Sequence, residues 1–245
     1  MSITAVVTSV GYGDFLQLTL PSMLKAIDRV VVATDENDLI TSTLCHKHGV
    51  PLVMTDAWQR GGAPFNKAAG IWAAIEFARR TGELDWLMLL DADIYIPSRA
   101  RAVLVEEWLD RDVMYSAPRR MARRPEDWAR MIERGNVEAV ALEERPRVVS
   151  RRGRPMLWGK YPTTNSVGIQ GYMQLWHWPT YPQESLPESS TAAMYDIALA
   201  LLWSDDRRVW LPTSVVHLGE NKKNWSGRVT ASWADVPPIP IDKEI

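Results

Sequence analysis

Two carboxylates one residue apart are the part of this sequence most suited to chemistry. Asp91 and Asp93 follow the apolar run Trp86–Leu90, which predicts that they lie at the end of a buried strand. Carboxylates this close repel each other unless a cation lies between them. Such oxygen ligands suit Mg²⁺ or Mn²⁺, usually together with phosphate oxygens. The pair therefore predicts a divalent metal site; the alternative is a strand-end turn whose carboxylates cap the next helix.

A late histidine could contribute to the same metal site. His217 follows a predicted strand over 208–216 and precedes a polar loop, and a neutral imidazole there could join Asp93 on a metal. Three cations of that loop could neutralise a diphosphate leaving group: Lys222, Lys223 and Arg228. The alternative is a histidine with ordinary strand-end partners and solvated lysines.

A single acidic residue interrupts the apolar helix predicted over 191–203. Asp196 is the only charge between Ala192 and Trp203, and a carboxylate in such surroundings is costly unless it is paired or has a function. Near a helix N-terminus the macrodipole favours the ionised form that a general base requires. Asp196 is therefore a candidate base, the alternative being a structural partner for a local arginine or a helix cap.

Alternating strands and helices are expected to position these residues. Apolar strand patterns at 3–10, 29–34, 50–55 and 85–90 alternate with helical patterns at 14–27, 37–48 and 65–81, which predicts an α/β fold with a mostly parallel sheet flanked by helices. Ligands of such sheets bind beyond the carboxyl ends of the strands. The polar residues at those ends are Thr8, Ser9, Asp35, Asp56, Asp91 and Asp93.

The second half of the chain is less regular. Its patterns predict a helix over 98–109, strands over 113–117 and 168–178, and the helix and strand described above. Residues 118–154 contain 11 Arg, no Lys and six acidic residues, so we interpret this stretch as a solvated insertion. A phosphate-bearing acceptor, nucleic acid included, is the alternative partner for it. We expect one domain over 1–245, with a nucleotide-binding half at 1–97 and an acceptor-binding half at 98–245.

The sequence resembles the GT-A fold glycosyltransferases over most of its length. The resemblance rests on Thr8-Ser9, Asp35, Phe65-Asn66-Lys67, Asp91-Ala-Asp93, Gly171-Tyr-Met-Gln174, Tyr195-Asp196 and His217. It implies a Rossmann-like domain in which Thr8, Ser9 and Asp35 face a nucleoside, and Asn66 or Lys67 lies near the ribose or sugar. It further implies that Asp91 contacts ribose and sugar hydroxyls, while Asp93 and His217 bind the metal. Asp196 matches the acidic base of many inverting members.

The resemblance implies a metal-dependent transfer of a sugar from a nucleoside-diphosphate sugar, by default a UDP-sugar, to an acceptor hydroxyl. With Asp196 as base, the transfer would invert the anomer. The expected acceptor is a glycan or another small hydroxyl compound, with a modified base in DNA as a lesser alternative. Two other classes stay open: a different nucleotide-dependent enzyme, such as a nucleotidyltransferase or phosphatase, and a non-catalytic sugar- or nucleotide-binding module.

Composition adds limits and one further candidate surface. The 245 residues carry a net charge of −2, which excludes a globally basic nucleic-acid binder. A single cysteine, no recognisable signal peptide and no long apolar stretch lead us to expect a cytoplasmic protein. The chain has 12 tryptophans, of which we expect about half to be core. We expect others to form an acceptor-binding wall that comprises Trp158, Gly171, Tyr172, Gln174, Trp176 and Trp178.

Overall fold

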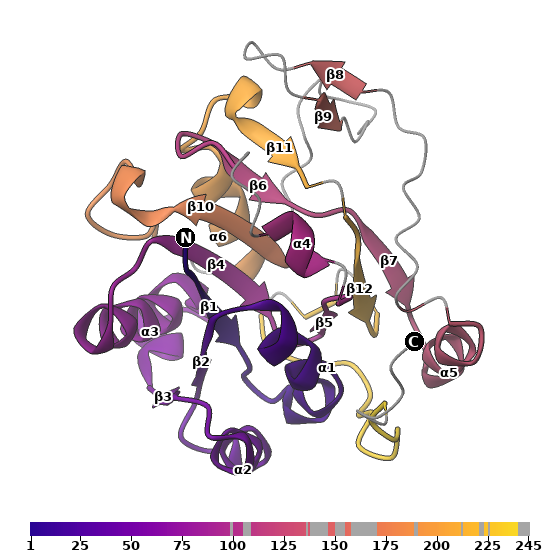
Figure 1. Cartoon of the computed structure of the whole chain (residues 1–245). Helices are drawn as coiled ribbons and strands as arrows, with labels where there is room; N and C mark the ends of the chain where they lie inside the picture. Colours follow the sequence, from indigo (N-terminus) through magenta and orange to yellow (C-terminus); the bar gives the residue numbers. More distant parts are fainter. Residues whose placement is uncertain are drawn as a thin grey trace.

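The computed structural model describes residues 1–98, 100–104, 109–135, 137, 147–149, 155–157, 171–188, 191–211, 213–220, 223–224 and 226–239. Trp158 and Lys222 lie outside the described residues. The described part forms a sheet of nine strands in the order β3-β2-β1-β4-β10-β6-β11-β9-β8 (Figure 1). Its parallel core consists of β1 (Ile3–Thr8), β2 (Arg29–Thr34), β3 (Leu52–Met54) and β4 (Trp86–Asp91). The predicted α/β class is confirmed.

The parallel strands are apolar throughout because helices cover both faces of the sheet. Ile3, Ala5 and Val7 of β1 pack against α1 (Gly13–Ala26), whereas Val6 points the other way and packs with α3 (Lys67–Thr81). A third helix, α2 (Leu39–His48), lies beside α1. A short 3₁₀ segment, η1 (Ala57–Gly62), precedes α3.

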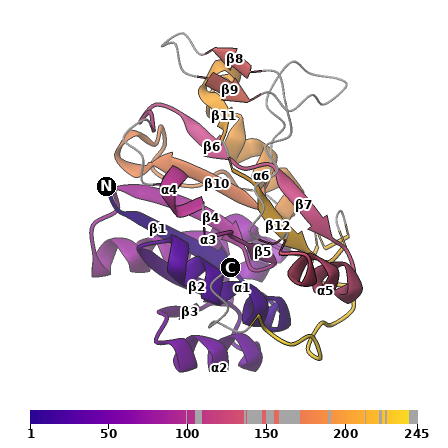
Figure 2. The ribbon, with the colours of Figure 1, turned by 45° about the vertical axis from the view of Figure 1, so that its right-hand side comes forward.

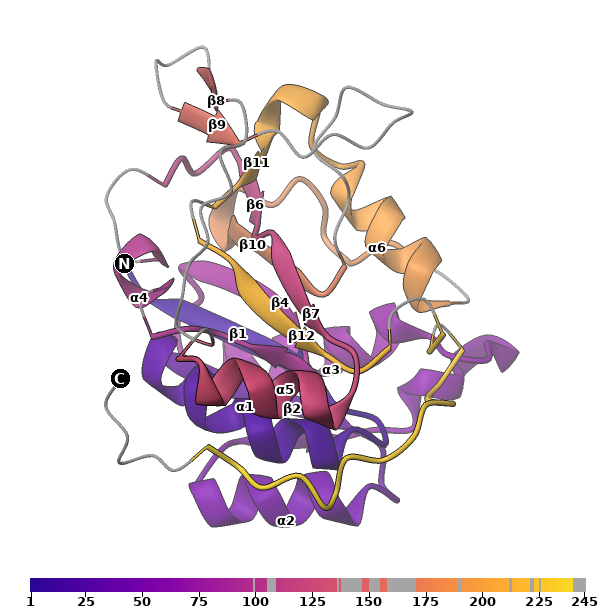
Figure 3. The ribbon, with the colours of Figure 1, turned by 90° about the vertical axis from the view of Figure 1, so that its right-hand side faces the viewer.

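The second half extends the sheet with a reversal of direction. Strand β10 (Met173–His177) runs antiparallel to β4. Where the chain is described, this strand is shorter than the one expected over 168–178. Beyond it lie β6 (Met114–Ser116), β11 (Arg208–Trp210), β9 (Pro155–Leu157) and β8 (Arg147–Val149). The remaining elements are α4 (Ala100–Leu104), α6 (Ala192–Ala200), η2 (Trp178–Thr180) and η3 (Asp205–Arg207). Helix α6 packs near α3 on the same face of the sheet (Figure 3).

A second, three-stranded sheet was not anticipated from the sequence. It joins β5 (Ile94–Tyr95), β12 (Val215–Leu218) and β7 (Arg119–Ala122) in the order β5-β12-β7, beside helix α5 (Pro125–Glu133) (Figure 2). Trp128 of α5 is fully buried against Val216 and Leu218. This corrects the interpretation of 118–154 as a solvated insertion for the part that is described, because 119–133 builds a strand and a helix of the fold.

Candidate active site

A buried lysine joins two carboxylates that are far apart in the sequence. The Nζ atom of Lys67, the first residue of α3, lies 2.8 Å from Oδ1 of Asp91 and 3.2 Å from Oδ1 of Asp196. The lysine side chain is 5% exposed. Asp91 ends β4 and Asp196 lies in the first turns of α6, so three elements meet at this point. The three side chains carry two negative charges and one positive charge when ionised.

The electrostatics of this triad raise the pKa of both carboxyls. Burial raises the pKa of Asp196 to about 6, against the opposing effect of Lys67 and with a further rise from the charge of Asp91. Burial also raises the pKa of Asp91, again opposed by Lys67. The two carboxylates raise the pKa of Lys67 more than its burial lowers it, so the lysine stays charged. One cation cannot fully neutralise both acids, and an acid with a pKa near neutrality results.

The second member of the carboxylate pair lies against the late histidine. Nε2 of His217 is 3.1 Å from Oδ2 of Asp93, and both side chains are largely buried. Strand β12 pairs antiparallel with β5, placing His217 beside Ile94, the residue after Asp93. The three-stranded sheet thus brings the two residues together across 124 positions of sequence.

The Asp93–His217 pair fits one side of a divalent metal site. Oδ1 of Asp93 is buried and has no hydrogen-bond partner in the described part of the chain. A carboxylate oxygen and an imidazole are a donor set that Mn²⁺ accepts. Asp91 instead directs an oxygen to Lys67, and no group of three His, Cys, Asp or Glu side chains gathers around one point among the described residues. The described part of the chain therefore offers two candidate ligands, and phosphate or water oxygens are suited to complete the coordination.

His217 has a second partner, which the sequence reading missed. The guanidinium of Arg119, on β7, lies 2.7 Å from Nδ1 of His217 and 4.4 Å above the ring of Tyr172. Tyr12 was missed as well: burial and the charges of Asp93 and Asp91 raise the pKa of its hydroxyl, which places the phenol near the carboxylate pair. The Gly-Tyr-Gly turn after the first strand was the available signal for Tyr12.

The residues expected to bind a nucleotide divide into two groups. Thr8 ends β1 in register with Asp91, and Asp35 follows β2, where its Oδ1 accepts a hydrogen bond from the backbone N–H of Asn37. Asn66 caps α3 by accepting a hydrogen bond from the N–H of Ala69. These side chains lie at the expected edge of the sheet.

Ser9 is also at that edge, but its hydroxyl points inward. It is fully buried and lies 2.8 Å from the hydroxyl of Thr41, which in turn donates to Asp38. The same Asp38 accepts a hydrogen bond from the N–H of Gly11. The structure thus gives Ser9 a role in fixing the loop after β1 rather than in contacting a nucleoside.

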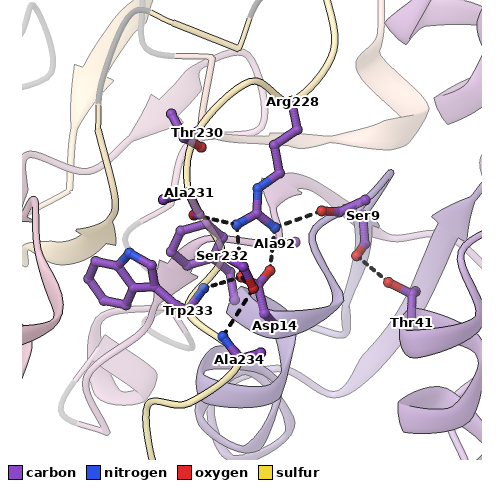
Figure 4. A network of polar contacts seen from close by, with 12 residues as sticks. Ser9, Asp14, Thr41, Ala92, Arg228, Thr230, Ala231, Ser232, Trp233 and Ala234 are labelled. Carbon is purple, nitrogen blue, oxygen red and sulfur yellow. Dashed lines mark hydrogen bonds and ion pairs between the residues drawn. The ribbon is translucent and has the colours of Figure 1, made fainter.

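Arg228 holds the C-terminal segment to the start of α1 rather than an open phosphate position (Figure 4). Its guanidinium pairs with both oxygens of Asp14, which is 4% exposed, and donates to the carbonyl of Ala231. The N–H of Trp233 donates to the same carboxylate, and the Trp233 ring lies 5.1 Å from that of Phe15. Burial would raise the pKa of Asp14, but Arg228 and the Trp233 N–H lower it below its usual value. This corrects the expectation that Arg228 neutralises a diphosphate.

Of the two candidate lysines in the loop after β12, one lies within the described residues. Lys223 forms an exposed ion pair with Glu220. The predicted diphosphate role of Lys222 falls outside the described residues, as does the acceptor role of Trp158.

The expected acceptor wall is reorganised because β10 runs away from the site. Gly171 and Tyr172 precede the strand and stay close: the carbonyl of Tyr172 accepts a hydrogen bond from the N–H of Asp91. Trp176 pairs with Leu87 towards the start of β4, is fully buried and packs on Trp203. Trp178 lies further along, stacked with Tyr181 and tilted against Trp72. Trp176 is therefore a core residue, and Trp178 follows the end of β10 that lies away from the carboxylates. Neither belongs to an acceptor wall.

Gln174 faces the helix that carries the candidate base. Its side-chain amide donates to the backbone carbonyl of Asp196 at 3.3 Å, and the residue is fully buried. Gln174 therefore supports α6 and has no surface to offer an acceptor.

The strand order, the helices on both faces and the carboxylates at the carboxyl ends of the strands define an α/β fold of the GT-A type. No protein-family profile and no curated sequence matches the chain. Among solved structures, mannosyl-3-phosphoglycerate synthase from Rubrobacter xylanophilus aligns with a TM-score of 0.53 and 12% identity over 91% of this chain and 68% of that one. A mycobacterial protein gives a TM-score of 0.51 and 10% identity over 91% of this chain and 68% of the other.

Residues 1–349 of S. aureus TarS align with a TM-score of 0.49 and 16% identity over 89% of this chain. This chain spans 60% of the length of the TarS structure and 68% of the synthase. At such identities the likeness to the synthase and to the mycobacterial protein, whose TM-scores exceed 0.5, establishes the fold alone. Among the described residues, no helix is long and apolar enough to cross a membrane.

Proposed function

We propose that the protein is a metal-dependent glycosyltransferase that uses a nucleoside-diphosphate sugar. The observation that carries the proposal is the meeting of Lys67, Asp91 and Asp196 at the carboxyl end of β4, beside the Asp93–His217 pair. The fold supports it, since an enzyme of the same fold is named for making a mannosylated phosphoglycerate. The natural acceptor is proposed only as a hydroxyl compound.

The proposed division of labour follows from charge and position. Asp93 and His217 would hold the metal, which when bound neutralises charge on the diphosphate of the departing nucleotide. Thr8 and Asp35 lie where a nucleoside would reach the sheet edge, and Asp91 is held by Lys67 so that its second oxygen can accept from ribose or sugar hydroxyls.

Asp196 is the proposed general base. Its carboxylate is held by Lys67, and its pKa of about 6 leaves it mostly ionised at pH 7 yet basic enough to take a proton from an acceptor hydroxyl. A base on the face opposite the leaving group would give direct displacement and inversion of the anomeric centre. The acceptor hydroxyl would attack the anomeric carbon as its proton passes to Asp196, and the nucleoside diphosphate would leave.

The test is a titration of UDP and GDP into the protein with and without Mn²⁺, followed by a screen of nucleotide sugars for Mn²⁺-dependent turnover. Asp93→Asn should abolish the metal-dependent part of nucleotide binding, and a chelator should do the same to the unaltered protein. The matched control is Asp56→Asn, an exposed aspartate after β3, which β2 and β1 separate from β4; it should bind like the unaltered protein. Binding indifferent to chelator and to Asp93→Asn would refute the metal role.

The products separate the three open classes. Release of a nucleoside diphosphate together with a sugar or a glycoside supports the proposal. Release of pyrophosphate from a nucleoside triphosphate indicates a nucleotidyltransferase, and release of inorganic phosphate indicates a phosphatase. Tight binding without turnover of any donor indicates a binding module.

A further inference from the structure

Arg119 and His217 are diagonal neighbours on one face of the three-stranded sheet. Strands β7 and β12 are parallel, with Arg119 opposite Val215 and Met121 opposite His217. Because side chains alternate along a strand, the residues at 119, 121, 215 and 217 share a face. The register therefore directs the guanidinium to the imidazole, and the contact between Arg119 and Nδ1 of His217 is 2.7 Å long.

This contact and the contact of Nε2 with Asp93 both determine which nitrogen of His217 carries the proton. A guanidinium has only donors, so Nδ1 must be the acceptor and must be unprotonated. The proton of the neutral ring is then on Nε2, from which it is donated to Oδ2 of Asp93 over 3.1 Å. A metal, however, would replace that proton at Nε2, and the neutral ring would then carry its proton on Nδ1. Two donors would face each other there if Arg119 stayed in place.

We propose that Arg119 is a positioning residue that, together with Asp93, holds His217 in its Nε2–H form and must leave Nδ1 before His217 can bind a metal. The inference rests on the proposed metal-dependent function. In this exchange the proton on Nε2 would pass to water and Nδ1 would take one from water, so the number of protons on the ring would not change. In the metal-free protein Arg119 thus occupies Nδ1 of His217, and a metal ion that binds the Asp93–His217 pair would displace it.

Arg119 is suited to such an exchange because little else holds it. Its contacts within the described part of the chain are Nδ1 of His217 and the face of Tyr172, with the guanidinium carbon 4.4 Å from the ring centroid. The Tyr172 hydroxyl is itself fixed by donation to the carbonyl of Ala117. Arg119 can therefore pivot on Tyr172 when it releases the imidazole, and its remaining N–H groups are then free to meet an anion such as a phosphate.

The first test reads the tautomer directly and needs no metal. The chain has four histidines, so imidazole ¹⁵N signals can be assigned to His217 by comparison with His217→Gln. In the unaltered metal-free protein we expect the Nε2–H pattern, and Asp93→Ala should keep it because Arg119 alone still requires an unprotonated Nδ1. Adding Arg119→Met to Asp93→Ala should shift the ring towards the Nδ1–H form, and Arg119→Lys in the same background, which keeps a charged donor, should restore the Nε2–H pattern. An Nδ1–H or doubly protonated ring in the unaltered protein, or no difference between Asp93→Ala and its combination with Arg119→Met, would overturn the inference.

The second test measures Mn²⁺ alone by calorimetry. Because a hydrogen bond from a charged donor must be broken for metal to enter, Arg119→Met should bind Mn²⁺ on the order of tenfold more tightly than the unaltered protein. Arg123→Met, which removes an exposed arginine just after the same strand, should bind like the unaltered protein. Adding His217→Gln to Arg119→Met should remove the gain.

The two proposals fail in different ways. Equal Mn²⁺ affinity in Arg119→Met and the unaltered protein refutes the role of Arg119 and leaves the proposed function standing. Absence of any Mn²⁺ binding to the unaltered protein, even with a nucleoside diphosphate present, refutes the metal-dependent function and with it the exchange.

Discussion

The carboxylate of Asp196 fills the space that a side chain at Gly171 would need. A Cβ built at Gly171 would lie 1.7 Å from Oδ2 of Asp196, much closer than two atoms can approach. The backbone of Gly171 is not in the left-handed region, so conformational freedom is not the reason for a glycine at this position. The reason is the lack of space for a side chain. The turn before β10 and the start of α6 can meet over Lys67 only because this position has no side chain.

Gly171→Ala should therefore displace Asp196 and break its pair with Lys67. We expect donor turnover to fall by about 100-fold or more, as for loss of a general base, and stability to fall by about 1–3 kcal/mol from overpacking. Steady-state kinetics and urea unfolding measure the two effects. Gly62→Ala is the control: it meets open space and costs only the strain of a left-handed backbone, so its activity should be normal. Normal turnover in Gly171→Ala would contradict the role of Asp196.

The pKa of Asp196 predicts the pH dependence of the reaction. Because a base must be ionised, kcat/KM should rise with pH through about 6 and level off above it. The pKa of Asp196 in the folded protein lies above the ordinary aspartate pKa of 3.8, so between these two values the folded protein holds a proton that the unfolded chain has lost. The stability contribution of this group is therefore full below about pH 4 and decreases as pH rises through 6. Asp196→Asn should abolish turnover and flatten this slope in urea unfolding; an unchanged slope would assign it to another group.

Arg228→Met should destabilise the protein without a specific loss of phosphate recognition. Removing one partner of a buried ion pair costs about 3–5 kcal/mol, because Asp14 is left charged among apolar side chains. Asp14→Asn with Arg228→Met should cost less than the sum of the single changes. Arg79→Met, in an exposed pair with Glu76, is the control and should change stability by less than about 1 kcal/mol. If Arg228→Met folds normally but loses affinity for nucleoside diphosphates, the result would instead support the role predicted from the sequence, in which Arg228 neutralises a diphosphate.

Thr41→Val and Asp35→Ala should separate the two groups of residues at the sheet edge. Thr41→Val removes the link between Ser9 and Asp38 and should cost about 1–3 kcal/mol of stability, because buried polar atoms lose their partner. Its nucleoside affinity should stay normal. Asp35→Ala should leave stability nearly unchanged and weaken UDP binding. Calorimetry with uridine and UDP, alongside urea unfolding, reads both, and the reverse pattern would restore Ser9 as a nucleoside contact.

The order of the first half was predictable because its strands and helices are local patterns. Apolar runs ended at Thr8, Asp35 and Asp91, and parallel pairing brings such ends to one edge. The pairing of Asp93 with His217 was predicted only through a family resemblance, since it depends on contacts across 124 residues.

What could not be predicted depends on strand direction and on partners distant in sequence. Trp176 was misplaced because one sequence cannot tell whether β10 runs towards or away from the carboxylates. Arg228 was misread because its partner, Asp14, is 214 positions away and looked like an ordinary helix-start acid. Arg119 was hidden within an arginine-rich run whose first residues build β7.

The separation between Asp14 and Arg228 also affects how the chain is made. During synthesis α1 leaves the ribosome before residue 228, so its buried carboxylate meets its cation only after 214 further residues have been added. Until then Asp14 lacks its cation, and Phe15 lacks the contact with the Trp233 ring. The start of α1 therefore reaches its final packing later than the local pattern of its helix would suggest.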